Sequence, residues 1–204
     1  MLLQTKRLTL REVLLTDLKQ IHELLSLKET DEFNTLGIPE NIEKTAQWVL
    51  DWSEEKKTSP RNFYTFSVEL TGQPSFVGLV ALYLGAANYK KGKIWIKLHS
   101  DHWNKGYATE CLKELLQFGF RHLQLHRIEA GCAVENIASK KVIEKAGFVQ
   151  EGLFRDNLSI RGKWVDNYEF AMLDTDFERL YPLQPDSPDI YRNEGINSSS
   201  GIIK

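Results

Sequence analysis

Apolar residues recur every three or four positions after Gly106, and this period predicts a long amphipathic helix. Shorter stripes of the same kind predict three more helices: one capped by Thr16, one from Pro39 to about Lys57, and one from Ala138 to Ala146. Residues 28–37, between the Thr16 and Pro39 helices, are mostly polar and are expected to form a loop.

Other stretches alternate apolar and polar residues or form short apolar runs, which is typical of strands. They are Arg7–Val13, Phe63–Leu70, Phe76–Leu84, Lys93–His99, Arg127–Val134, Val149–Leu158 and Trp164–Leu173. The turn Thr71-Gly72-Gln73-Pro74 predicts that the second and third of these strands form an antiparallel hairpin. The resulting order of elements, β-α-α-β-β-β-α-β-α-β-β, predicts a single α/β domain.

The chain has 204 residues, enough for one domain with a substantial core. Apolar periodicity ends near Phe177, so we expect a domain at residues 1–177 and a polar C-terminal tail at 178–204. The net charge of -2 argues against a nucleic-acid-binding surface, and no apolar run is long enough to span a membrane. Because the first residues also lack the apolar core of a signal peptide, we expect a cytoplasmic protein.

The two cysteines, Cys111 and Cys132, lie in apolar segments, where a free thiol is usually a small buried hydrophobic group. With only these two cysteines, we expect no disulfide framework and no cysteine-based zinc site. His99 and His102 are too few ligands for zinc by themselves, so no metal is expected.

One candidate for chemistry is the segment Trp103-Asn104-Lys105-Gly106-Tyr107-Ala108-Thr109-Glu110, where a strand leads into the long helix. Small residues here let backbone N–H groups approach an anion, and the unpaired amides of a helix N-terminus stabilise phosphate charge. A pyrophosphate would fit this loop, although a single glycine could equally well supply only the turn.

A second candidate is the segment from Glu135 to Phe148, in which Asn136 and Ser139 stand at the start of a helix. By position alone, Asn136 could be an N-cap and Ser139 an ordinary residue of the first helical turn.

Together, Lys105-Gly106-Tyr107-Ala108-Thr109-Glu110 and Asn136-x-x-Ser139 with Glu144-Lys145-Ala146-Gly147-Phe148 resemble the GNAT superfamily, specifically its RimJ/RimL-type ribosomal-protein N-acetyltransferases. Thr5-Lys6-Arg7-Leu8-Thr9-Leu10-Arg11 and Arg161-Gly162-Lys163-Trp164-Val165-Asp166 extend the resemblance over nearly the whole domain. It implies the GNAT-type acyl-CoA N-acyltransferase fold, a mixed central sheet flanked by helices, with acetyl-CoA as co-substrate. We also expect that the protein can form a homodimer.

The resemblance also implies roles for individual residues. Backbone amides would bind the pyrophosphate of acetyl-CoA at Trp103, Asn104, Lys105, Gly106, Tyr107, Ala108 and Thr109. Leu98 and His99, at the end of a splayed strand, would pair with the pantetheine arm. Asn136 and Ser139 would lie beside the thioester, Asn136 as a cofactor contact and both as catalytic residues.

Two positions depart from the family pattern. Asn104 stands where this branch usually has a second glycine, and the strand Ile94-Trp95-Ile96-Lys97-Leu98 replaces a run that usually contains Gly-Tyr-Trp. The first departure bears on the pyrophosphate loop and the second on the chamber for the acceptor.

The expected reaction is direct attack of a neutral amine on the thioester, with a strand amide stabilising the oxyanion and Ser139 protonating the leaving thiolate. Cys132 offers an alternative as an acetylated nucleophile, but no activating cation or base is evident beside it. A non-catalytic acetyl-CoA-binding module is a further alternative, against which the presence of both Asn136 and Ser139 argues.

The expected acceptor is the α-amine of a protein N-terminus, because its pKa of ~7.7–8.0 leaves a useful neutral fraction without a strong base. A small amine such as an antibiotic or a polyamine is the alternative. Glu29, Asp31 and Glu32 could attract a cationic acceptor or could simply be solvated loop residues.

Overall fold

Eight strands form one sheet in the computed structural model, which describes residues 1–73 and 75–183. The strands are β1 (Leu2–Gln4), β2 (Leu8–Glu12), β3 (Phe63–Leu70), β4 (Phe76–Leu84), β5 (Lys91–Leu98), β6 (Arg127–Ala133), β7 (Val149–Ile160) and β8 (Lys163–Leu173). Their spatial order is β1-β2-β3-β4-β5-β6-β8-β7, and all neighbours are antiparallel except the parallel pair β5 and β6. The sheet is therefore mixed, as the resemblance implied.

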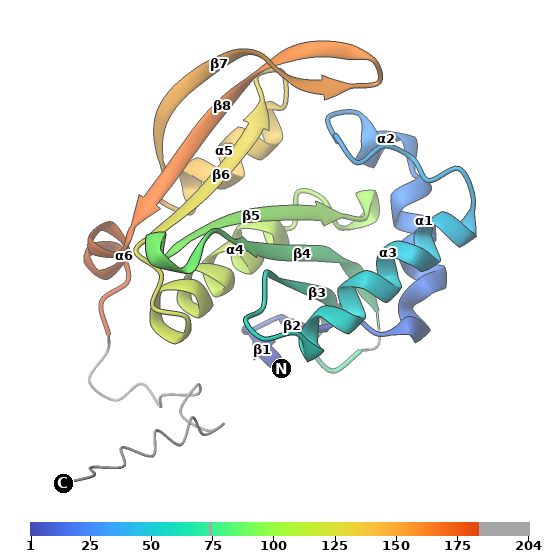
Figure 1. Cartoon of the computed structure of the whole chain (residues 1–204), viewed down its shortest axis with the longest axis horizontal. Helices are drawn as coiled ribbons and strands as arrows, with labels where there is room; N and C mark the ends of the chain where they lie inside the picture. The colour runs from blue at the N-terminus through green and yellow to red at the C-terminus, as the bar shows by residue number, and fades with distance from the viewer. Residues whose placement is uncertain (74, 184–204) are drawn as a thin grey trace, which may run out of the picture.

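Helices cover both faces of the sheet. They are α1 (Leu18–Ser26), α2 (Lys28–Asp31), α3 (Ile42–Glu54), α4 (Tyr107–Gln117), α5 (Ile137–Lys145) and α6 (Asp174–Leu180). On one face, Ile21 of α1 and Val49 of α3 pack with Leu79 of β4, whereas on the other Leu112 of α4 packs in a cluster with Phe66 of β3 (Figure 1). Burying each such side chain stabilises the fold by ~1.5–3 kcal/mol. No helix in the described ranges is long and apolar enough to cross a membrane.

The sheet splits between its two parallel strands. Paired residues run only from Lys91 and Arg127 to Lys93 and Glu129. Beyond Lys93, β5 continues to Leu98 alongside β4, while β6 continues alongside β8, so the two strands diverge (Figure 1). The gap leaves backbone N–H and C=O groups on the inner edges of β5 and β6 without a strand partner.

All the predicted strands and helices form, several with shifted bounds, and three short elements, β1, α2 and α6, were not predicted. The hairpin strands β3 and β4 have the predicted bounds, and the helix after Gly106 is confirmed as α4 followed by a π-helical turn, Phe118–His122. The prediction of a loop over residues 28–37 was wrong in part, because α2 lies there. The first predicted strand is shorter than expected, and a separate strand β1 precedes it.

Two helix starts also differ from the predictions. Asn41, rather than Pro39, precedes α3, and its side-chain oxygen accepts a hydrogen bond from Lys44 N–H at 2.9 Å. Thr16 caps no helix, because it lies inside a 3-10 turn before α1. The Asp17 carboxylate closes that turn by accepting from the N–H of Leu14 at 2.9 Å.

The packed chain continues past the boundary expected at Phe177. That residue lies within α6 and is fully buried. Beyond it, the Tyr181 hydroxyl donates to the carbonyl oxygen of Ala146 at 3.0 Å, which ties the end of α6 to α5. The segment therefore packs at least as far as Tyr181, and the part of the expected tail after Leu183 lies outside the described residues.

Candidate active site

The loop between β5 and α4 has a backbone suited to an anion. Asn104 and Gly106 adopt left-handed conformations, with φ of 59° and 79°, and alternation of this kind turns successive N–H groups toward a common concavity. Gly106 is the N-cap of α4 and makes no side-chain cap bond, so the first helical amides remain available. The conformation also explains Asn104, because asparagine tolerates positive φ better than most non-glycine residues.

Residues from the N-terminal strand region fix this loop. The Arg7 guanidinium pairs with the Glu110 carboxylate at 2.6 Å and donates to the Lys105 carbonyl oxygen at 3.0 Å. Thr5 donates its hydroxyl hydrogen to the same carboxylate at 2.5 Å. Burial alone would raise the pKa of Glu110, but the hydrogen bonds from Thr5 and Arg7 outweigh it and hold that pKa below its usual range. Glu110 is therefore a structural anion that anchors the loop.

The two residues expected to pair with pantetheine are not equivalent. The His99 N–H already donates to the carbonyl oxygen of Val77 on β4 at 2.9 Å. Because successive peptide groups point to opposite edges of a strand, the Leu98 N–H points away from β4, toward the gap. The Leu98 carbonyl oxygen accepts from the Trp103 indole at 2.9 Å, which ties the strand end to the loop. Of these two residues, Leu98 is therefore the one whose backbone N–H is directed toward the gap.

Asn136 and Ser139 lie together where β6 leads into α5. The Asn136 side-chain oxygen accepts from the Ser139 N–H at 3.0 Å, so Asn136 is the helix N-cap. The Ser139 side chain lies close to the Cys132 thiol. Burial raises the pKa of Cys132 to about 11, and the contacts with Ser139 and Lys140 offset only part of that rise. A thiol of this kind is a weak nucleophile at neutral pH.

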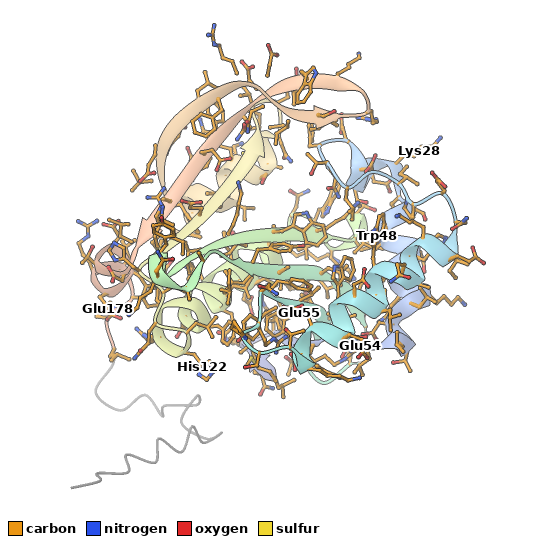
Figure 2. All side chains as sticks on the ribbon, viewed as in Figure 1. Lys28, Trp48, Glu54, Glu55, His122 and Glu178 are labelled. Carbon is orange, nitrogen blue, oxygen red and sulfur yellow. The ribbon has the colours of Figure 1, made fainter. Side chains whose placement is uncertain are left out.

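A cavity of ≈ 700 Å³ opens between the β7–β8 hairpin and the segment after α2. Its charged lining consists of four carboxylates and two cations: Glu32, Glu135, Asp156, Asp166, Arg161 and Lys163. Arg161 also joins the two walls, because its guanidinium donates to the Glu32 carbonyl oxygen at 2.8 Å. Figures 1 and 2 show the hairpin tip beside α2, where Lys28 is labelled, at the far end of the molecule from His122 and Glu178.

The histidine pair His99 and His102 lies at the loop between β5 and α4. The rings are 6.3 Å apart, and His102 also packs 6.1 Å from the ring of Tyr107. Among the residues that the structure describes, no group of three histidine, cysteine or acidic side chains is arranged to hold a metal ion.

Sequence reasoning assigned no role to Arg7 or to Lys97, and gave Asp31 only a general attraction for cations. Arg7 lies in a segment that carried the family resemblance, but its partner Glu110 is distant in the sequence. Asp31 and Lys97 are both buried polar residues. The available signal for Lys97 was its charge directly after the apolar run Ile94-Trp95-Ile96.

Taken together, the split sheet, the left-handed turns before α4 and the charged cavity are the features expected of an acetyltransferase of the acyl-CoA type. Residues 7–149 match the acetyltransferase (GNAT) domain family. The chain is 31% identical over 177 residues to the uncharacterised N-acetyltransferase YnaD of Bacillus subtilis, covering 85% of this chain and 97% of YnaD. The chain therefore belongs to the GNAT acetyltransferases and is an acetyl-CoA-dependent N-acetyltransferase.

Two further similarities bear on the acceptor. A crystal structure of the spermidine N-acetyltransferase of Vibrio cholerae, in complex with CoA and spermine, superposes with a TM-score of 0.74 and 26% identity over 85% of this chain and 99% of that one. The [ribosomal protein uS5]-alanine N-acetyltransferase of Escherichia coli is 30% identical over 114 residues, 53% of this chain and 54% of that protein. These two proteins are named for different acceptors, spermidine and an alanine of a ribosomal protein.

Proposed function

We propose that the acceptor is the α-amine of a protein N-terminus, as in RimJ/RimL-type enzymes. The observation that carries this proposal is the mixed charge of the cavity beside the gap, where Arg161 and Lys163 stand among four carboxylates. A peptide N-terminus offers a cationic amine to the carboxylates and carbonyl oxygens to the two cations. A polyamine offers only cationic donors, which Arg161 and Lys163 would repel.

The proposed acetyl-CoA site lies on the opposite side of the gap. We assign the pyrophosphate to the backbone amides from Trp103 to Thr109, and the pantetheine arm to the inner edge of β5 at Leu98 and, through its side chain, His99. Asn136 would contact the cofactor as the N-cap that holds the turn before α5. The left-handed Asn104 and Gly106 support this assignment because they shape the loop for an anion.

The proposed chemistry is direct attack of the neutral amine on the thioester. The Leu98 N–H, directed into the gap, would donate to the oxygen that becomes negative. Ser139 would donate its hydroxyl proton to the leaving sulfur. Asn136 would hold Ser139 in position, because its side-chain oxygen accepts a hydrogen bond from the Ser139 backbone N–H. The acceptor ammonium loses one proton to water before it attacks, since an α-amine has a pKa of ~7.7–8.0. The proton that the attacking nitrogen then loses returns through water to the Ser139 oxygen.

A small polyamine is the second candidate acceptor. It is favoured by the similarity to the spermidine N-acetyltransferase and by the excess of carboxylates over cations in the cavity. The cationic pair Arg161 and Lys163 argues against it for the reason given above.

A panel of acceptors tests the proposal through CoA release. The panel contains peptides with free alanine or serine N-termini, the same peptides blocked at the N-terminus but carrying a lysine, and spermidine. Preference for the free N-termini supports the proposal. Preference for spermidine or for the lysine side chain would refute it, and no CoA release with any amine would support a non-catalytic acetyl-CoA-binding module.

We also propose that the protein acts in the cytoplasm and can form a homodimer. Sizing by light scattering at several concentrations tests the assembly, and a monomer at all of them would rule the homodimer out.

A further inference from the structure

Asp31 and Lys97 carry opposite charges and are buried together without direct contact. They are 3% and 4% exposed, and neither Asp31 Oδ1 nor Lys97 Nζ has a hydrogen-bond partner among the described residues. Burial raises the pKa of Asp31 and lowers that of Lys97 to about 8, and the attraction between the two charges opposes both shifts. Because unpaired buried polar groups are costly and rare in folded proteins, this pair indicates a missing third group.

The pair lies on the face of the sheet where we place the acceptor. Lys97 pairs across strands with Leu79, whose side chain packs under α1 and α3, so Lys97 points to that same face. Its position is beyond Lys93, in the part of β5 that has separated from β6. Asp31 ends α2, the next two residues line the cavity, and Arg161 of the cavity lies within electrostatic range of the Asp31 carboxylate.

The two side chains define the chemistry of the group that would join them. Lys97 Nζ can only donate hydrogen bonds, and an ionised Asp31 can only accept them. A polyamine carries only donors, so it would leave Lys97 unpaired and add a further positive charge beside it. A peptide unit has a carbonyl oxygen for Lys97 and an N–H for Asp31, and therefore satisfies both.

We propose that Asp31 and Lys97 form a subsite for the first peptide unit of the acceptor, next to its reacting α-amine. In this subsite the Lys97 ammonium donates to the carbonyl oxygen and the Asp31 carboxylate accepts from the amide N–H. The inference rests on the proposed function, which it deepens from a free α-amine to an α-amine followed by an amide. The subsite selects the acceptor and has no part in the bond-forming step.

The test compares alaninamide with isopropylamine, which has the same carbon skeleton without the amide. For the wild-type chain and Lys97→Met, kcat/KM is measured with both amines at saturating acetyl-CoA. Lys97→Met should lower kcat/KM for alaninamide by about 10-fold or more, since a hydrogen bond to a charged group is lost, and for isopropylamine by less than about 3-fold. The ratio of kcat/KM for alaninamide to kcat/KM for isopropylamine is compared between the two proteins. The different pKa values of the two amines affect both proteins equally and therefore do not affect this comparison.

Lys93→Met is the matched control. Lys93 lies on the same strand and the same face, but its ammonium is exposed and pairs with Glu169 at 3.2 Å. This variant should leave the ratio of kcat/KM for alaninamide to kcat/KM for isopropylamine unchanged. Where isopropylamine reacts too slowly, its inhibition constant against alaninamide supplies the same comparison.

The outcomes separate the subsite from the proposed function. Equal losses for both amines, or no loss, would overturn the subsite and indicate that only water joins Asp31 and Lys97. If the wild-type chain fails to release CoA with every amine and peptide tested, the proposed function is refuted, and the subsite with it. If Lys97→Met does not fold, Asp31→Ala removes the hydrogen-bond acceptor and should lower kcat/KM for alaninamide relative to isopropylamine. An unchanged ratio of these two kcat/KM values would likewise overturn the subsite.

Discussion

Replacing Ser139 with alanine separates catalysis from structure at the start of α5. The hydrogen bond that holds this turn runs from the Ser139 backbone N–H to the Asn136 side chain at 3.0 Å, and alanine retains it. The variant loses only a half-buried hydroxyl and its contact with the Cys132 thiol. We therefore expect little change in melting temperature or in the affinity for acetyl-CoA.

Turnover should fall clearly in the same variant. Assistance from a general acid is typically worth ~10²–10⁴-fold, so kcat should drop within that range unless water replaces the hydroxyl. Cys132→Ala should keep most of the activity. With a pKa of about 11 for the Cys132 thiol, the thiolate fraction at pH 7 is on the order of 10⁻⁴, which makes an acetylated cysteine a slow route.

Steady-state kinetics on both variants, with thiol detection of released CoA, provides the measurement, and Ser139→Thr is the control that retains a hydroxyl. Mass spectrometry after incubation with acetyl-CoA alone shows whether an acetyl group reaches Cys132. Normal turnover in Ser139→Ala beside an inactive Cys132→Ala and an acetylated wild-type chain would refute direct transfer.

Gly106→Val should raise the Kd for acetyl-CoA by more than 10-fold in calorimetry and also lower the free energy of unfolding by ~1–2 kcal/mol, because a β-branched residue is strained at φ of 79°; unchanged affinity in a folded variant would contradict the pyrophosphate assignment. Arg7→Ala should raise the same Kd by about 10-fold with little loss of stability, since the guanidinium holds the loop by charge-assisted hydrogen bonds, whereas alanine at a remote arginine on α6 should have no effect. Burial lowers the pKa of Lys97 from 10.5 to about 8, so its contribution to stability is present above pH 10.5 and is lost as the pH falls through 8. In denaturant titrations of the wild-type chain, the free energy of unfolding should rise by about 3 kcal/mol from pH 8 to pH 10.5, and Lys97→Met should lack this rise. The same pH dependence in both proteins would show that Lys97 is not buried as a charge. Truncation after Phe177 should lower the melting temperature by several degrees because it removes the bond from α6 to α5, while truncation after Leu183 should not; equal melting temperatures would show that this contact is dispensable.

Elements with a strong local pattern could be predicted from the sequence. β3 alternates apolar and polar residues over eight positions, and β4 is an apolar run of nine residues. The two strands are joined by a glycine-containing turn, which fixes both their bounds and their pairing. The amphipathic stripe and initial glycine of α4 likewise determine that helix. In contrast, β1 and α2 have only three and four residues, too few to show a period. They form because neighbouring elements pair with or pack against them.

Parts of the candidate site depend on pairs that are distant in the sequence. Glu110 belongs to a recognisable motif, but its role as an anchor depends on Arg7, 103 residues away. Asp31 reads as a solvated loop acid until α2 forms, and only the fold brings it near Lys97. The departure at Asn104 could be noticed in the sequence, whereas its physical reason, a left-handed backbone, required the structure.

The two long-range pairs, Arg7 with Glu110 and Asp31 with Lys97, lie on opposite faces of the sheet, which is split between β5 and β6. Arg7 and Glu110 stabilise the loop at the start of α4, on the face where the phosphates are proposed to bind. Asp31 and Lys97 lie on the face that α1 and α3 cover, where we place the acceptor. Groups on the inner strand edges, such as the Leu98 N–H, are directed into the gap between the two strands. A continuous sheet would pair those groups, so the proposed reaction requires that β5–β6 pairing stops after three residues.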